Sequence, residues 1–366
     1  MAHPRRPPRA GPPHTQRPGR RSARAGLRAA AVLVPVLFVS LGTPAARAAE
    51  PSSVEDAWRA VFKRQAEPPA PPDNPMSAAK VALGHRLFSD RRLSAAGQRS
   101  CASCHQPERS FSDGRPRARG LNGADLARNT PSLWNLAWSS RYFWDGRAPS
   151  LEAQVVMPIT ARDEMAGEWP SILGQLGADA RLPAQFQAAF PGEPAITEAT
   201  VAKALAAYVR SLISPPTRFD AWIEGDRSAL AVAEVRGFRI FTGKAGCVLC
   251  HVGWRFTDDR FHDVGLGSKD AGRGAVDGGT PGLPAFKTPS LRELTGTAPY
   301  MHDGSLPTLA AVVKHYAGGL RRRPSLAPNI NPRLRLSAGE RSDLIRFLKT
   351  LSSDRRPARL EQAGRP

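Results

Sequence analysis

The sequence is short of several features that would point to other classes of protein. Cysteine occurs only four times and histidine eight times in 366 residues, and no histidine lies between positions 105 and 251. So few cysteines exclude a disulfide-rich scaffold. After residue 48 no apolar run approaches the roughly 20 residues that span a bilayer, and no alternating apolar pattern predicts a substantial sheet. We therefore expect a mainly helical chain with long loops.

All four cysteines lie in two copies of one pentapeptide, Cys101-Ala102-Ser103-Cys104-His105 and Cys247-Val248-Leu249-Cys250-His251. This pattern is typical of covalent haem c attachment, because two thiols at this spacing reach both vinyl groups and the adjacent histidine ligates the iron. A four-thiolate zinc site and a redox dithiol are the alternatives. Neither requires a histidine after each pair, so we predict two haem c groups, attached through the four cysteines and ligated by His105 and His251.

The N-terminus has the pattern of an export signal. Residues 1–28 are rich in arginine and proline and contain no acid, Ala29–Leu41 is apolar, and Ala46-Arg47-Ala48 is a cleavage sequence. We predict a signal peptide over 1–48 and a periplasmic protein. An uncleaved anchor is the alternative, although the apolar run is short and contains Pro35.

Removal of the signal would moderate the charge. The whole chain carries +20, and residues 1–48 hold nine of its 52 basic residues and none of its 32 acidic ones, which leaves 43 − 32 = +11. Such an excess can steer an acidic redox partner. No nucleic-acid-binding module or basic face with interleaved aromatic residues is present, so nucleic acid is not an expected partner.

The remaining length suits two domains. We predict an N-terminal haem domain over 49–215, a C-terminal haem domain over 216–353 and a disordered tail over 354–366, with the boundary at Pro215-Pro216. In this arrangement the haems lie at either side of the domain interface.

Apolar periodicity predicts a helix over Thr200–Leu212 and another over about Ala229–Phe241. Ser337 and Glu340 form a capping box for a last helix that buries an apolar stripe ending near Leu351. The proline-rich stretch Ala66–Pro75 and the glycine-rich stretch Gly265–Pro284 are expected to be irregular.

Beyond the pentapeptides, a series of short motifs resembles the bacterial di-haem cytochrome c peroxidases, in particular their MauG-like branch. The motifs run from about Ala79 to Leu351 in the family's order, and they include Phe111-Ser112-Asp113-Gly114, Arg128-Asn129-Thr130-Pro131, Phe143-Trp144-Asp145-Gly146-Arg147, Phe286-Lys287-Thr288-Pro289-Ser290-Leu291 and Ala298-Pro299-Tyr300-Met301-His302-Asp303-Gly304. The resemblance implies an oxidoreductase that uses hydrogen peroxide as electron acceptor.

The resemblance also implies the site that receives the peroxide. Many family members place a histidine sixteen residues after the first pentapeptide, where this chain has Leu121. The face of the first haem opposite His105 is therefore expected to be open. In that pocket the family's acid and base corresponds to Glu164, the peroxide-positioning residue to Gln154 and the shaping residue to Pro158. His85 is not expected to be a ligand.

The second haem has four candidate sixth ligands, Met301, His302, His315 and Tyr316. An ungapped match to the family places Tyr316 at the ligand position, as in MauG-type enzymes, and His315 remains the main competitor. A phenolate is a hard anionic oxygen ligand, which favours high oxidation states of iron.

Two further sites follow from the resemblance. Trp144 corresponds to the indole that lies between the two haems. Asn129, Thr297 and Pro299 correspond to calcium ligands, and oxygen donors suit this cation.

We therefore expect a di-haem peroxidase whose electrons arrive through the C-terminal haem from a small cytochrome c or cupredoxin. One alternative is a MauG-like oxidase that modifies tryptophan or tyrosine of a partner protein. MauG passes oxidising equivalents through a tryptophan two residues before its second pentapeptide, where this chain has Ala245. A second alternative is a non-catalytic di-haem electron carrier.

Overall fold

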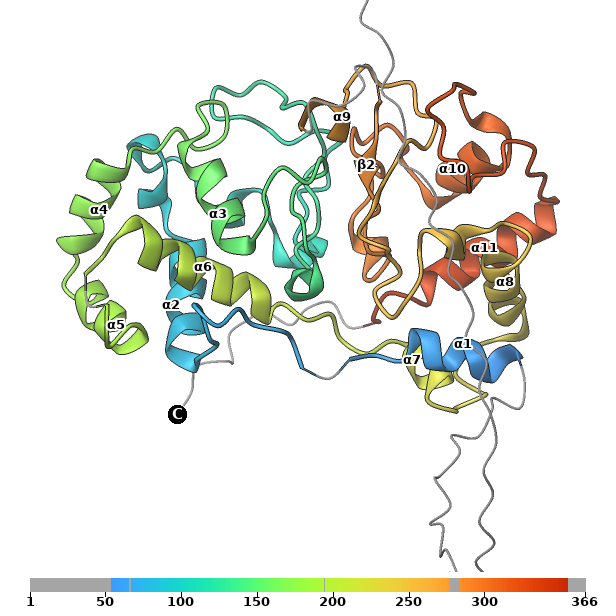
Figure 1. Cartoon of the computed structure of the whole chain (residues 1–366), viewed down its shortest axis with the longest axis horizontal. Coiled ribbons are helices and arrows are strands. Elements are labelled where there is room, and N and C mark those ends of the chain that lie inside the picture. The colour runs from blue at the N-terminus through green and yellow to red at the C-terminus, as the bar shows by residue number, and fades with distance from the viewer. Residues whose placement is uncertain (1–53, 66, 194, 277–282, 355–366) are drawn as a thin grey trace, which may run out of the picture. The chain divides into compact units, whose positions relative to one another are not determined.

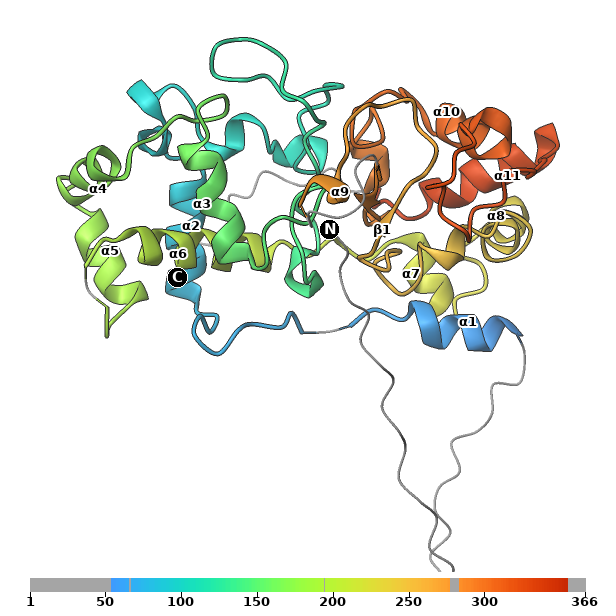
Figure 2. The ribbon, with the colours of Figure 1, turned by 45° about the horizontal axis from the view of Figure 1, so that its top comes forward.

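The computed structural model of the protein describes residues 54–65, 67–193, 195–276 and 283–354. As predicted, these residues are mainly helical and contain little sheet (Figures 1 and 2). The predicted signal peptide and all but the first residue of the predicted tail lie outside them. The α-helices are α1 (Val54–Phe62), α2 (Ala78–Phe88), α3 (Leu151–Thr160), α4 (Trp169–Gly177), α5 (Leu182–Ala189), α6 (Glu198–Ser211), α7 (Arg218–Ile223), α8 (Val232–Thr242), α9 (Arg273–Val276), α10 (Leu309–Lys314) and α11 (Ala338–Lys349).

The regular sheet is minimal. Strands β1 (Phe261–His262) and β2 (Phe286–Lys287) pair antiparallel, with Phe261 opposite Lys287. Short 3₁₀ turns form at both pentapeptides, over Cys101–Ser103 and Cys247–Leu249. None of the described helices is long and apolar enough to span a membrane.

The predicted helices are confirmed in α6, α8 and α11. The capping box of α11 forms as expected, because the Glu340 N–H donates to the Ser337 hydroxyl (3.1 Å) and the Ser337 N–H donates to the Glu340 carboxylate (2.7 Å). Leu351 lies just beyond the helix and is fully buried. The described residues of 66–75 form no helix or strand, while α9 interrupts the otherwise irregular stretch 265–284, of which 277–282 lie outside the described residues.

Buried side chains form two hydrophobic cores. The first draws on α2, α3, α4, α5 and α6, and the second on α7, α8, α10 and α11. Phe62 of α1 belongs to the second core, where its ring contacts those of Phe219, Phe238 and Phe256 at centroid distances of 5.8, 5.7 and 4.8 Å. In Figure 1, α1 (blue) accordingly lies beside α7 (yellow-green). The division into domains at residue 215 stays a prediction.

A short sequence repeat relates the two parts of the chain that contain these cores. With an offset of 158 residues, 131–150 matches 289–308 at Pro-Ser-Leu, at one further leucine, at the tyrosine and Asp-Gly that follow, and at the final Pro-Ser or Pro-Thr. The structure repeats as well, since Ser150 caps α3 and Thr308 caps α10 through hydrogen bonds of 3.1 Å to the third backbone N–H of each helix. The repeat therefore assigns equivalent positions in the two parts of the chain. We call the part that contains 131–150 the first repeat, and the part that contains 289–308 the second repeat.

The same packing recurs where helices cross. A Cβ added at Gly84 of α2 would lie 2.0 Å from the Ala204 carbonyl oxygen of α6, and one added at Gly237 of α8 would lie 2.1 Å from the Asp343 carbonyl oxygen of α11. No side chain fits at such distances. Glycine is therefore required for both crossings, which fix the helices that precede each pentapeptide.

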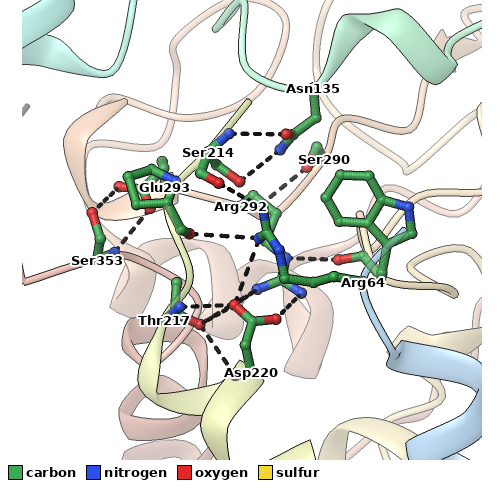
Figure 3. A network of polar contacts seen from close by, with 11 residues as sticks. Arg64, Asn135, Ser214, Thr217, Asp220, Ser290, Arg292, Glu293 and Ser353 are labelled. Carbon is green, nitrogen blue, oxygen red and sulfur yellow. Dashed lines mark hydrogen bonds and ion pairs between the residues drawn. The ribbon is translucent and has the colours of Figure 1, made fainter. Parts of the chain in front are cut away.

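A buried polar network holds the segment between the cores (Figure 3). Arg292 donates to both carboxylate oxygens of Asp220 at 2.8 Å, and its Nε donates to the Trp254 carbonyl (2.6 Å). Arg64 donates to the Ser214 carbonyl (2.6 Å), and Asn135 of the first repeat bonds the Ser214 hydroxyl (2.9 Å). The network thus joins the segment around 214–220, which connects the two cores, to both parts of the chain.

Candidate functional site

One cavity of about 1200 Å³ lies between the repeats, larger than the roughly 300–1,000 Å³ of ordinary small-molecule pockets. All the predicted site residues line it, although they come from segments far apart in the sequence. They are Cys101, Cys104, His105, Asn129, Trp144, Gln154, Pro158, Glu164, Cys247, Cys250, His251, Thr297, Pro299 and Tyr316. The fold therefore gathers every one of these residues around a single space.

Both pentapeptide histidines are held in the same way. His105 donates from Nδ1 to the Phe111 carbonyl (2.9 Å), and His251 donates from Nδ1 to the Phe256 carbonyl (2.8 Å). Phe111 and Phe256 have left-handed backbone conformations (φ 58° and 56°). A hydrogen bond at Nδ1 fixes the ring and leaves Nε2 as the metal-ligating nitrogen. Burial lowers the pKa of both histidines, which favours the neutral form that binds iron.

The cysteines do not fit the other readings of the pentapeptides. All four are free thiols, and burial raises the pKa of Cys101 and Cys247 to about 12, whereas redox dithiols have lowered values. In the described part of the chain, the one group of three potential metal ligands within 4.8 Å of one another is Cys250, Asp258 and His262. A four-thiolate zinc site is therefore not assembled, and the two thiol pairs with their histidines fit haem c.

The predicted distal residues lie on α3 and on the turn after it. Gln154 and Pro158 are one helical turn apart on α3 and face the cavity. Burial raises the pKa of Glu164, and Asp163 adds to this effect while Arg147 opposes it. The turn is closed by the Leu121 N–H, which donates to the Asp163 carbonyl (2.9 Å). Leu121, which the sequence resemblance places at the position of a loop histidine, is thus fixed beside the predicted acid and base.

The helix α3 is anchored on its other side by buried charges. Glu152 accepts from Arg210 of α6 (2.8 Å) and from Asn74 (2.8 Å), and Asn74 in turn accepts from Lys80 (3.1 Å). Burial of Glu152 raises its pKa, but the hydrogen bonds from Asn74 and Arg210 outweigh this, so the pKa is lowered. The anchored carboxylate fixes the rotation of α3 and hence the direction of Gln154.

Trp144 is held from both repeats. Its indole N–H donates to the Asn129 carbonyl (2.9 Å), and its own carbonyl accepts from the Lys287 N–H (2.8 Å). The equivalent bond runs from the Asn129 N–H to the His302 carbonyl (2.8 Å), since 129 and 287, and 144 and 302, are related by the offset of 158. The two repeats therefore meet with approximate twofold symmetry at this point.

The Asp-Gly turns show the same symmetry. Gly146 (φ +69°) packs against Phe261 of the second repeat, and Gly304 (φ +63°) packs against the Pro116 backbone of the first. An added Cβ would approach these neighbours to 2.2 and 2.1 Å, so both turns need glycine. Arg128 adds an ion pair across the junction, with Nε 2.7 Å from Asp270.

The four candidate sixth ligands differ in their surroundings. Tyr316, Met301 and His302 line the cavity, whereas His315 does not and is bonded through Nε2 to the Val264 carbonyl (2.8 Å). The repeat places Met301 and His302 opposite Phe143 and Trp144, at the junction. Tyr316 lies eight residues after the Thr308 cap, just as Pro158 lies eight residues after Ser150. Burial, with Cys247 and Cys250 nearby, raises the pKa of Tyr316.

Sequence reasoning named His302 only as a candidate ligand, and it missed Asn329 altogether. His302 stacks on Phe286 with centroids 3.5 Å apart and planes 9° apart, burial lowers its pKa to about 4, and its Nε2 has no hydrogen-bond partner among the described residues. Asn329 donates to Cys250 Sγ (3.1 Å). The sequence repeat with its offset of 158 residues was the signal that could have placed His302 opposite Trp144. His85 is exposed, its ring packs at a tilt of 33° against that of Tyr208, and it does not line the cavity.

Comparison with known proteins gives consistent results. The profile of the family described as di-haem cytochrome c peroxidase matches residues 78–228. The methylamine utilization protein MauG of Methylorubrum extorquens is 47% identical over 315 residues, which cover 85% of this chain and 89% of that protein. The cytochrome-c peroxidase IdrP1 of Denitromonas iodatirespirans is 36% identical, over 78% and 84%. A crystal structure of a MauG-like protein associated with microbial copper homeostasis superimposes with a TM-score of 0.74 and 34% identity, over 81% and 95%.

Proposed function

The chain belongs to the MauG-like branch of the di-haem cytochrome c peroxidase family, a family of oxidoreductases with peroxide as acceptor, and on this premise we propose that it is an exported, periplasmic enzyme that reduces hydrogen peroxide at its N-terminal haem. Cys101, Cys104 and His105 would hold one haem c group and Cys247, Cys250 and His251 the other, in two cytochrome c-like domains with the haems on either side of the domain interface. The observation that carries the proposal is the convergence of both Cys-Cys-His sets, Glu164, Gln154 and Tyr316 on one cavity.

The two haems would differ in what the chain offers opposite each histidine. A haem iron with a vacant coordination position supplies the electrons that cleave peroxide. Opposite His105, the repeat position carries Pro158, which has no ligating atom, and Leu121 stands where a ligand histidine would be. Opposite His251, Tyr316 offers a phenol oxygen. The first face is therefore the one that admits peroxide.

Glu164 is suited to move a proton between the two peroxide oxygens. Its carboxyl is more than half buried and has a raised pKa, which brings it closer to the working pH and improves it as an acid and base. Gln154 projects from α3, whose rotation the Glu152–Arg210 pair fixes, and its amide can hold the peroxide in register with Glu164. Buried Val155 and Met165 help to exclude water.

Trp144 is placed to carry charge between the two haems, because it lines the cavity at the junction and is held by Asn129 and Lys287. Calcium is a further part of the proposal. Asn129, Thr297 and Pro299 line the same junction, and their side-chain and main-chain oxygens are donors that this cation prefers. Water would complete its shell.

The test is to add peroxide to the fully oxidised, haem-loaded protein and to follow both haems optically, after electron paramagnetic resonance has counted the spin states. We expect a high-spin signal equivalent to one haem, a reaction without prior reduction, and return of the starting spectrum when a reduced cytochrome c or cupredoxin is added. Two low-spin irons and no reaction would instead indicate an electron carrier.

A second candidate function is oxidation of tryptophan or tyrosine side chains in a partner protein. Tyr316 favours it, because an anionic oxygen ligand stabilises highly oxidised iron, and the 47% identity to a MauG protein is consistent with it. Ala245 stands where MauG has the tryptophan that passes oxidising equivalents, so the partner would differ from that of MauG. Mass spectrometry of secreted partner proteins incubated with the enzyme and peroxide would detect new oxidations that the Tyr316→Phe variant fails to produce.

A further inference from the structure

The second pentapeptide exposes apolar side chains that the first does not. Leu249 is 57% exposed and Val252 is 37% exposed, and they flank Cys250 and His251. Ser103 takes the place of Leu249 in the first pentapeptide, and Gln106, the residue after that pentapeptide, takes the place of Val252. Single exposed apolar side chains are ordinary on protein surfaces, but two of them beside a haem-attachment motif, combined with a suitable charge around them, offer an apolar contact for another protein.

A basic loop lies against this surface. Residues 320–336 contain five arginines and no acidic residue, a net charge of +5. Asn329, in the middle of the loop, donates to Cys250 Sγ (3.1 Å), and Leu334 lines the cavity. Of the five arginines, Arg323 is paired with Asp263. The other four, Arg321, Arg322, Arg333 and Arg335, are exposed, and no described carboxylate forms an ion pair with them.

The corresponding stretch of the first repeat has the opposite charge. Between α3 and α6, residues 161–197 contain two arginines and five acidic residues, or −3, whereas the stretch between α10 and α11 carries +5, a difference of 8 charges. The positive charge of this loop therefore attracts a negatively charged protein toward the second pentapeptide. The two stretches follow α3 and α10, which have corresponding places in the two parts of the chain, so the contrast is local and does not simply follow from the net charge of the whole chain.

We propose that Leu249, Val252 and the four exposed arginines, here called the docking surface, bind an acidic soluble redox protein. The inference rests on the proposed function. Each encounter transfers one electron from the partner's reduced centre to this chain, and two encounters supply the two electrons that, with two protons, convert one hydrogen peroxide to two water molecules. Leu249 and Val252 would form the apolar contact with the partner, close to its redox centre, and this contact would be short-lived. The four arginines would accelerate association with the acidic partner.

The test uses the haem-loaded protein and two reduced copper proteins of similar size and potential, one acidic and one basic. The variant R333E/R335E is compared with R181E/R227E, a matched control that makes the same charge change at two exposed arginines of 161–197 and of the α7–α8 connection. We expect R333E/R335E to slow oxidation of the acidic donor at least tenfold at low salt, an effect that added salt removes. The control should change the rate less than threefold.

Leu249→Ser, which copies the first pentapeptide, should weaken binding of the acidic donor several-fold through faster dissociation. Titration calorimetry without peroxide measures this directly. Equal effects of the two double variants, or faster oxidation of the basic donor by the wild type, would overturn the proposal. A small uncharged ferrocene reductant tests the peroxidase function separately from the docking surface. With it, all variants should reduce peroxide at the rate of the wild type. If the wild type itself does not reduce peroxide with ferrocene, the proposed function is refuted and not the docking surface.

Discussion

The buried ion pair between Arg292 and Asp220 allows a quantitative prediction. Their side chains are 0% and 3% exposed, and two hydrogen bonds of 2.8 Å join them. In Asp220→Ala the guanidinium of Arg292 would stay buried without its anion, and the nearby Arg64 would lose its partner as well. Breaking such a pair costs about 3–5 kcal/mol, which corresponds to a change of about 150- to 5,000-fold in the unfolding equilibrium constant.

Guanidinium chloride unfolding of the haem-loaded protein, followed by far-ultraviolet circular dichroism, measures this cost when the denaturant slope is unchanged. The matched control is Asp125→Ala, which breaks the exposed pair with Arg119 and should cost less than about 1 kcal/mol. The double variant Asp220→Leu/Arg292→Met should recover at least half of the loss, because apolar residues can replace a buried pair. The reasoning fails if Asp220→Ala costs no more than the control, or if the double variant is less stable than the single one.

Three further outcomes are expected. The rate of peroxide reaction should rise with pH through a midpoint above the ordinary glutamate value of about 4.3, because burial raises the pKa of Glu164, and stopped-flow measurements on Glu164→Gln should lose this step. Gly237→Ala should destabilise the protein by about 1–3 kcal/mol, since its Cβ would meet the Asp343 carbonyl at 2.1 Å; thermal unfolding unchanged from the wild type would contradict this. Arg128 lowers the pKa of Asp270. The stability from their pair is therefore fully present above the unfolded aspartate pKa of about 3.9, and it is lost as the pH falls below that value and through the lower folded pKa. Asp270→Asn should accordingly flatten the acid limb of a curve of stability against pH.

Local chemistry made much of this structure predictable from sequence. Some features depend only on residues close together in the sequence, and among them the Ser337 cap of α11 and the helix α6 were predicted correctly. The two pentapeptides are local signals of the same kind. The contacts between distant segments were not predictable in the same way. The Arg128–Asp270 pair and the Asn329–Cys250 bond join residues 142 and 79 positions apart, and each residue alone reads as an ordinary surface polar group. These contacts lie in irregular loops, which are extensive because the chain forms little sheet. Helical or strand periodicity in the sequence gives no information about such loops.

The repeat explains how one architecture can hold two haems with different chemistry. The Nδ1 bonds of His105 and His251, the caps of α3 and α10, and the Gly84 and Gly237 crossings are the same in both parts, so the proximal side of each site is set by shared packing. The differences are confined to the opposite side and to the surface. Eight residues after each helix cap, one copy has a proline without a ligating atom and the other a tyrosine.

The same division extends to the outside of the molecule. After α3 the chain is acidic and contributes Glu164 to the interior, while after α10 it is basic and places Asn329 on Cys250. A peroxide molecule is small and neutral and needs no charged docking face, whereas a protein donor does. The charge contrast between the two stretches is consistent with the proposed division of labour, in which the pocket with Glu164 would admit the oxidant and the surface near Cys250 would meet the reductant. Trp144, held between Asn129 and Lys287 at the approximate twofold axis, is the side chain that we propose connects them.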